Sequence, residues 1–157
     1  MDAVVEVQQV SKDFPLGKVV VRALRGVDLN IERGEFTAVA GPSGSGKTTL
    51  LNLIGCVDVP TSGEVRIEGQ PTSQLSERHR TRLRLHKLGF IFQTFNLVSV
   101  LDVRQNVELP LLLQGSMTSA ERRKRCEEVI EGVELTDQMI QRPNELSGGQ
   151  RQRVAIA

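Results

Sequence analysis

One stretch of the sequence combines glycines, a lysine and a hydroxyl side chain at a spacing that can bind phosphate. Gly41, Gly46, Lys47 and Thr48 fit the pattern G-x-x-x-x-G-K-[ST]. Glycines let backbone N–H groups point toward one anion, and a helix that begins near Lys47 adds the positive end of its dipole. The lysine contributes a charge, and the threonine hydroxyl can bind Mg²⁺. The pattern therefore predicts a site for phosphate groups with magnesium, against the simpler alternative of a flexible glycine turn.

A second glycine-containing segment has similar chemistry. Residues Leu146 to Gln150 form the string LSGGQ, and Arg151 and Arg153 follow it. Ser147 and two glycines at the start of a helix would present N–H groups and one hydroxyl to an anion. This segment is predicted to be a second phosphate-binding surface.

Strands and a helix are needed to position the first site. The apolar run Phe36–Ala40 predicts a buried strand that enters the glycine loop. A helix is expected over Lys47–Cys56, with Leu50, Leu51 and Ile54 on one stripe. The sequence thus predicts a strand, a glycine loop and a helix in succession.

Further strands are indicated by alternating or continuous apolar residues. The alternation is seen at Val5 and Val7, at Val27, Leu29 and Ile31, and at Val65 and Ile67. Leu88–Phe92 is a continuous candidate strand that ends at Gln93. Together with the helices, these segments predict an α/β fold.

The character of the sequence changes near Thr118. Thr118 and Glu121 have the spacing of a capping box, and Cys126, Val129, Ile130 and Val133 follow at helical intervals. An amphipathic helix is expected here. A last helix is expected over Arg151–Ala157, with no glycine or proline to end it, so the chain is expected to stop inside a helix.

Composition excludes several classes of protein. Twenty Lys and Arg against nineteen Asp and Glu leave a net charge of +1, and five Phe without Trp or Tyr offer few rings for stacking bases, so a generic nucleic-acid module is not expected. No apolar run approaches the roughly 18 residues of a membrane span, and the N-terminus lacks a secretory signal, which predicts a soluble cytoplasmic chain. Cys56 and Cys126 have no metal-ligand spacing and are expected to be reduced and buried.

The order of these motifs resembles the ATP-binding domain of ABC transporters. In that resemblance Gly41–Thr48 corresponds to the Walker A loop, Gln93 to the Q-loop glutamine and Leu146–Gln150 to the family signature. Phe14 matches the position where the family stacks an aromatic ring on adenine. The segments Gly89–Gln93, Phe95–Leu97 and Asn106–Pro110 are similar to the bacterial subgroup of lipoprotein-release, macrolide-export and cell-division ATPases. The residues thus expected to bind ATP are Phe14, Gly41, Pro42, Ser43, Gly44, Ser45, Gly46, Lys47, Thr48, Thr49 and Gln93, and those of the signature are Leu146, Ser147, Gly148, Gly149 and Gln150.

The resemblance also implies an organisation. The fold would be a P-loop NTPase core of the ABC type, a mixed sheet flanked by helices, with a β subdomain and P-loop core over residues 1–93 and a helical signature subdomain over 94–157. Two such domains would pair head to tail, so that the signature of one caps ATP on the other. Thr48 and Gln93 would contact Mg²⁺, and Gln93 would also face water and a transmembrane permease. The protein would lie on the inner face of a bacterial membrane.

The resemblance implies that the chain is incomplete at its C-terminus. The Walker B aspartate, the catalytic glutamate and the switch histidine of the family all follow the signature, beyond Ala157, and neither His79 nor His86 can replace them by position. Hydrolysis is therefore expected of a longer parent, with Gln93 as the catalytic residue present here, and the 157 residues alone are expected to be inactive.

Some alternatives remain at this stage. A soluble ABC ATPase acting on DNA or ribosomes is the second functional hypothesis, although the interval from Lys47 to Ser147 leaves no room for the arms of such proteins. The basic stretch Arg78–Lys87 fits a solvated helix face, with binding to nucleic acid or anionic lipid as the other option. Leu109–Leu113 fits equally a contact with a transmembrane subunit or core packing. A P-loop GTPase or kinase is excluded, because D-x-x-G and N-K-x-D are absent.

Overall fold

The computed structural model describes residues 3–157. The chain divides into two compact units, of which the first ends at Leu88 and the second is Gly89–Ala157. The sequence had suggested a division five residues later, between residues 93 and 94. Each unit has its own hydrophobic core, so each is described by itself.

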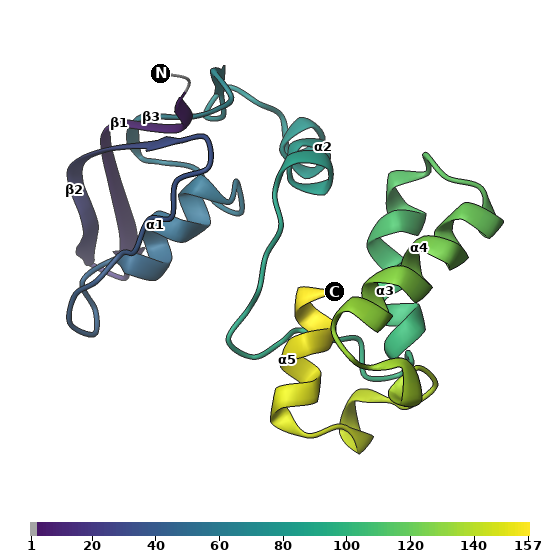
Figure 1. Cartoon of the computed structure of the whole chain (residues 1–157). Helices are drawn as coiled ribbons and strands as arrows, with labels where there is room; N and C mark the ends of the chain where they lie inside the picture. The colour runs from purple at the N-terminus through teal and green to yellow at the C-terminus, as the bar shows by residue number, and fades with distance from the viewer. Residues whose placement is uncertain (1–2) are drawn as a thin grey trace. The chain divides into compact units, whose positions relative to one another are not determined.

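A four-stranded antiparallel sheet forms one layer of the first unit (Figure 1). It contains β1 (Ala3–Leu16), β2 (Val19–Glu32), β3 (Ser62–Ile67) and β4 (Gln70–Pro71), in the order β2-β1-β3-β4. The pairs Val5 with Ile31 and Val7 with Leu29 are in register, and Val65 pairs with Val7 from the other side. The alternating apolar residues therefore form the strands that their period predicts.

Helix α1 (Lys47–Ile54) packs against this sheet (Figure 1). Leu50 and Leu53 are buried in the core with Val7 and Val65, whereas Leu51 is 53% exposed. The predicted stripe was thus wrong at one position, because Leu53 rather than Leu51 lies at i+3 from Leu50. The helix ends at Ile54 instead of Cys56, where Gly55 serves as its C-cap.

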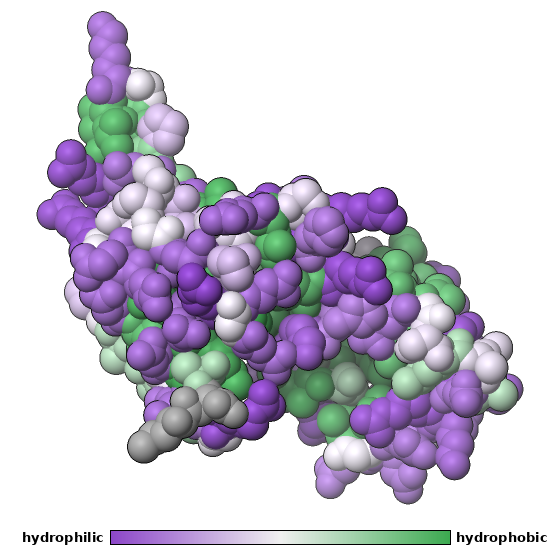
Figure 2. Space-filling view, turned by 90° about the horizontal axis from the view of Figure 1, so that it is seen from above, coloured by the Kyte–Doolittle hydropathy of each residue, from purple (hydrophilic) through white to green (hydrophobic). Residues whose placement is uncertain are grey.

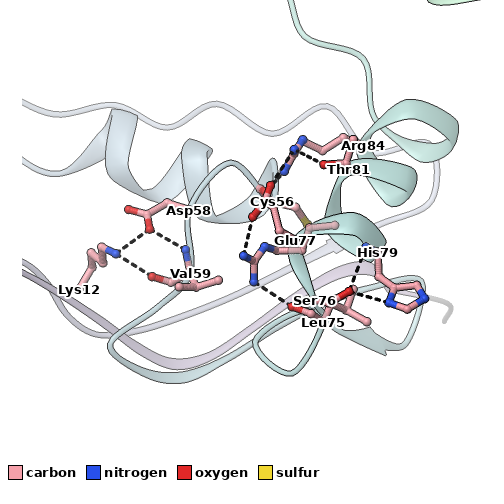
Figure 3. Close-up of polar contacts among 11 residues, drawn as sticks. Lys12, Cys56, Asp58, Val59, Leu75, Ser76, Glu77, His79, Thr81 and Arg84 are labelled. Carbon is pink, nitrogen blue, oxygen red and sulfur yellow. Dashed lines mark hydrogen bonds and ion pairs between the residues drawn. The ribbon is translucent and has the colours of Figure 1, made fainter. Parts of the chain in front are cut away.

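Helix α2 (Glu77–Lys87) completes the first unit. Ser76 caps its N-terminus, and Leu83 joins the core. Its basic residues are not uniformly solvated, since Arg80 and Arg84 are partly buried and both form ion pairs with Glu77. Arg84 also donates a hydrogen bond to the carbonyl of Cys56 (Figure 3). The prediction of a solvated face is thus correct for Arg78 and Arg82, which are exposed.

Two predicted strands are absent from the structure. Phe36–Ala40 and Leu88–Phe92 are irregular, and Phe36 and Ile91 are 96% and 61% exposed. A strand needs a neighbour to satisfy its backbone N–H and C=O groups. Within residues 3–157 no strand pairs with either segment, because the sheet consists of β1 to β4 alone.

The second unit is helical. It contains α3 (Val103–Gln114), α4 (Ser119–Gly132) and α5 (Gly148–Ile156), with short 3₁₀ turns at Thr136–Gln138 and Pro143–Glu145. Helix α3 contacts both α4 and α5 (Figure 1). The hydrophobic core of this unit consists of Val103, Val107, Cys126, Ile130, Leu135, Leu146 and Val154. The predicted capping box at Thr118 and Glu121 is present, so the expected start of the amphipathic helix is confirmed.

The Leu109–Leu113 segment, for which the sequence left core packing and contact with a transmembrane subunit open, is only partly buried. Leu111 packs against the core, whereas Leu112 and Leu113 are 53% and 64% exposed. Other large apolar side chains are also exposed, and hydrophobic patches lie between hydrophilic residues on the face shown in Figure 2. In residues 3–157 no helix is long and apolar enough to cross a membrane.

Both cysteines are free and buried, as expected. Burial raises the pKa of the Cys56 thiol and of the Cys126 thiol. A raised thiol pKa disfavours the reactive thiolate, which fits a packing role for both residues.

Candidate functional site

The glycine loop leads directly into α1. Gly46 is the N-cap of this helix and has a φ of 89°, in the left-handed region. A Cβ atom on Gly46 would lie 2.6 Å from the carbonyl oxygen of Ala23 and 2.9 Å from Cδ2 of Leu24, both on β2. Glycine is therefore required here for two reasons, the backbone conformation and the close approach to β2.

The N-terminus of α1 lacks a side-chain cap, which its glycine N-cap cannot provide. The first N–H groups of a helix have no partner within the helix. In the other α-helices of residues 3–157 a side chain accepts from one of these groups, namely Ser76, Asp102, Thr118 and Ser147. Open amide groups and a helix dipole attract anions, so the N-terminus of α1 has the features on which the predicted phosphate site depends.

The Lys47 side chain forms hydrogen bonds with the glycine loop that precedes it. Its Nζ donates to the carbonyl oxygens of Gly41 and Pro42, both at 2.8 Å, and lies 3.4 Å from Oγ of Ser45. The ammonium is thereby held among the backbone groups of residues 41 to 46. A positive charge, open amides and a helix dipole thus occur in one short segment, a combination that favours anions in general.

Phe14 lies near the end of β1 and is 40% exposed. The Nζ of Lys12 lies 5.1 Å from the centroid of its ring. The same ammonium donates to Oδ1 of Asp58 at 2.7 Å and to the carbonyl of Val59 at 2.8 Å (Figure 3). One side of the aromatic ring is therefore next to a fixed cation.

Gln93 belongs to the second unit, whereas Phe14 and the glycine loop belong to the first. It lies in an exposed turn with Thr94. Phe95 and Asn96, which follow, have φ values of 63° and 51°, unusual for residues other than glycine. The guanidinium of Arg151 lies 5.6 Å from the centroid of the Phe95 ring. The turn that carries Gln93 is thus connected to α5.

The LSGGQ segment forms the start of α5. Leu146 is buried in the helical core, and Oγ of Ser147 accepts from the backbone N–H of Gln150. The Gln150 side chain accepts in return from the N–H of Ser147. Gly148 and Gly149 are exposed, and a Cβ on either would meet no atom within 4 Å. The segment is anchored by one leucine and presents two glycines on an open surface.

Comparison with known sequences decides the family. The pattern of the ABC transporter family matches residues 24–157. The chain belongs to the ABC transporter family. Its glycine loop and LSGGQ segment therefore belong to an ABC-type ATP-binding domain.

Three matches show what the chain is similar to. The ABC transporter ATP-binding protein MJ0796 of Methanocaldococcus jannaschii is 47% identical over 156 residues, which cover 98% of this chain and 66% of that protein. The macrolide export ATP-binding/permease protein MacB of Marinobacter nauticus is 44% identical over 153 residues, covering 98% of this chain and 24% of MacB. A dimeric structure of MJ0796 bound to ADP and Pi superposes with a TM-score of 0.90 at 48% identity, over 97% of this chain and 67% of that one.

These comparisons confirm the ABC-type fold. The 157-residue chain spans about two thirds of the length of MJ0796 and about a quarter of the length of MacB. The roles of the individual site residues stay predictions, as do the Mg²⁺ ligands and the subdomain limits.

Sequence reasoning missed several side chains that support the site. Lys12 and Asp58 are 46 positions apart, and Phe95 and Arg151 are separated by most of the second unit. No periodic or local pattern links such pairs. The capping box of Asp102 and Gln105 in α3 was also missed, although its spacing gives a local signal.

Proposed function

We propose that this ABC domain binds Mg·ATP and is the ATP-binding part of an exporter. In such a protein, ATP binding and hydrolysis would drive export or membrane extraction of a substrate through a transmembrane permease. The macrolide-export name of MacB supports export, and the ATPase would then lie peripherally on the inner face of the membrane.

The observation that carries the proposal is the uncapped N-terminus of α1 with Lys47 bonded inside the loop. The triphosphate of ATP would accept from the N–H groups of the loop and of Lys47, Thr48 and Thr49. The Lys47 ammonium would exchange its carbonyl partners for phosphate oxygens, a charge-assisted contact that is stronger than a neutral one. Phe14 would stack on the adenine.

The donor set fits Mg²⁺ held chiefly by the nucleotide. In residues 3–157 no group of three or more His, Cys, Asp or Glu side chains could hold a metal. Mg²⁺ is usually bound by a few protein oxygens together with phosphate oxygens and water. The Thr48 hydroxyl and the Gln93 amide oxygen are the proposed protein ligands. The metal would offset the charge of the phosphates.

The LSGGQ segment would act on a second copy of the domain. Its open glycines and Ser147 would meet the phosphates of ATP bound to the partner's glycine loop, in a pair related by a two-fold axis. The dimeric structures of MJ0796 support this arrangement. Gln93 would contact the Mg²⁺ or the attacking water as the catalytic residue present in this chain.

Hydrolysis needs a group that orients the attacking water, and often a carboxylate does this. The resemblance to the family implies that this carboxylate follows the LSGGQ segment, and residues 151–157 contain no Asp or Glu. We therefore expect the 157-residue chain to bind Mg·ATP without releasing phosphate. Phosphate release at the rate of a complete relative such as MJ0796 would show that the catalytic group lies among these residues.

Urea unfolding with and without Mg·ATP tests the binding proposal. ATP at a hundred times the wild-type Kd, the same concentration for every variant, should raise the free energy of unfolding of the wild-type chain by about 2.7 kcal/mol. Lys47→Ala should remove most of this gain, whereas Lys18→Ala, at an exposed lysine in the β1–β2 turn, should retain it. Equal stabilisation of the Lys47→Ala variant would overturn the assignment of the phosphate site.

A further inference from the structure

We propose that Lys12 is a positioning residue for base recognition, which holds the Phe14 ring so that its free face can stack on adenine. The inference rests on the proposed function, ATP binding at the glycine loop. It adds a residue whose role is to act through Phe14 rather than to touch the nucleotide.

Lys12 is unusually enclosed for a lysine. Its side chain is 12% exposed, although lysines are almost never buried unless they are paired. Oδ1 of Asp58 and the carbonyl oxygen of Val59 accept hydrogen bonds from its Nζ, at 2.7 and 2.8 Å (Figure 3). These two partners fix the position of the ammonium, so the charge near the ring does not depend on a mobile side chain.

The fixed ammonium occupies one side of the Phe14 ring. Its distance of 5.1 Å from the ring centroid is within the range of a cation–π contact. Lys12 and Phe14 are two residues apart on β1, whose pairing with β2 shifts register on both sides of Lys12, so the contact itself rather than strand alternation places the ammonium over the ring. Phe14 is nevertheless 40% exposed, which leaves ring surface for a base.

A cation behind the ring also favours stacking on its other face. Two stacked aromatic rings place their negative faces together, which opposes a face-to-face arrangement. The ammonium draws electron density toward itself and makes the opposite face less negative. Adenine, whose own face is rich in electrons, should therefore stack better on Phe14 when Lys12 is charged.

The partners of Lys12 connect this ring to the phosphate-binding helix. The backbone N–H groups of Val57 and Asp58 donate to the carbonyl of Asn52 in α1, at 2.9 and 3.3 Å. From the other side, Arg84 of α2 donates to the carbonyl of Cys56 (Figure 3). The turn after α1 is thus held by hydrogen bonds from β1, α1 and α2.

This arrangement fixes the adenine and phosphate subsites relative to each other. The N-terminus of α1 faces the phosphates, and the turn after its C-terminus holds Lys12. A nucleotide that uses both subsites gains from this fixed spacing, whereas a ligand with phosphates alone does not. Comparing the affinities for these two classes of ligand therefore distinguishes a positioning role of Lys12 from a general effect of Lys12 on folding.

The test compares Mg·ATP with magnesium tripolyphosphate, which lacks ribose and base, by calorimetric titration of the 157-residue chain. Lys12→Met keeps most of the side-chain length and removes the charge. We expect its affinity for ATP to fall about three- to tenfold, with the affinity for tripolyphosphate unchanged. Lys12→Arg, which keeps the cation, should restore most of the loss.

Phe14→Ala supplies the decisive comparison. If Lys12 acts through the ring, Lys12→Met should cause no further loss of ATP affinity in the Phe14→Ala background. Asp58→Asn should reproduce part of the Lys12→Met effect by releasing the ammonium, and serves if Lys12→Met does not fold. Glu68→Gln breaks ion pairs with Arg33 and Lys87 in the same unit and should leave both affinities unchanged.

The outcomes distinguish this inference from the proposed function. If the wild-type chain binds both ligands and Lys12→Met lowers the affinity for ATP and for tripolyphosphate equally, Lys12 has only a structural role. That result would reject the inference. The same rejection follows if the Lys12→Met loss persists in the Phe14→Ala background. If the wild-type chain binds neither ligand, the proposed function fails first, and the inference fails with it.

Discussion

The guanidinium of Arg151 lies over the ring of Phe95, 5.6 Å from its centroid. Arg151 is in α5, just after the LSGGQ segment, and Phe95 is two residues after Gln93. The Nε atom of Arg151 is buried and has no hydrogen-bond partner among the described residues. The ring contact therefore connects two segments to which we assign nucleotide-contacting roles.

This contact predicts a measurable coupling between the two residues. Arg151→Met and Phe95→Leu should each destabilise the chain, and the double variant should lose less than the sum, with a coupling of about 0.5–1 kcal/mol. Urea unfolding of the four proteins measures this. Arg123→Met, which changes an exposed arginine of α4, is the matched control and should show no coupling with Phe95→Leu. Additive losses at Arg151 and Phe95 would contradict the prediction.

Gly46 and Gly44 allow a paired test of the glycine loop. Both have positive φ, 89° and 77°, but only at Gly46 would a Cβ collide with β2. Gly44→Ala should cost about 1–2 kcal/mol from backbone strain alone. Gly46→Ala adds overpacking against Ala23 and should cost about 2–5 kcal/mol in total, with loss of ATP binding. Equal costs for the two variants in urea unfolding would show that contact with β2 does not constrain the loop.

Several elements that the sequence predicted correctly are set by local interactions. Val5 and Val7 pair with a strand that returns after one short turn, so their alternation is sufficient. Thr118 caps α4 through a residue three positions away. The strand predicted over Phe36–Ala40 is absent. An apolar run becomes a strand only beside a partner strand, and local sequence does not reveal whether one is present.

The candidate site was predictable to a similar extent. The glycine loop and the LSGGQ segment are short contiguous motifs, and both occur where a helix begins. The supporting pair Lys12 and Asp58 depends on how β1 and the turn after α1 come together in the fold. Such long-range contacts carry no periodicity, so the residues that hold Phe14 could be identified only from the structure.

Glu64 accepts four hydrogen bonds at the start of β3. Its donors are the backbone N–H groups of Val65, Thr72 and Ser73, at 3.1 to 3.2 Å, and the Ser73 hydroxyl at 2.6 Å. Burial acts to raise the pKa of this carboxyl, but the hydrogen bonds from Ser73, Thr72 and Val65 outweigh it and lower the pKa. The ionised form is therefore favoured in the folded chain.

The lowered pKa predicts how stability changes with pH. The ionised Glu64 stabilises the fold fully above its unfolded pKa of about 4.3, and this contribution is lost as pH falls through the lowered folded value. Glu64→Gln should cost about 1–2 kcal/mol at pH 7 and progressively less below pH 4. Urea unfolding at pH 7, 5 and 3.5 measures the difference. Glu134→Gln, at an exposed glutamate, is the control, and a constant Glu64→Gln cost across this range would refute the assignment.

Gly148→Asp separates the stability of α5 from the proposed role of its N-terminus. The site is open, so the new side chain fits, and a carboxylate in the first turn should stabilise the helix by about 0.3–1 kcal/mol. The same charge would repel the phosphates of ATP on a partner domain. We expect unchanged or higher stability and unchanged Mg·ATP binding to the glycine loop, with loss of ATP-driven pairing with a complete ABC domain such as MJ0796 in sedimentation. Gly148→Ala is the uncharged control and should weaken pairing less. Full pairing of Gly148→Asp would show that the LSGGQ segment does not meet the partner's nucleotide.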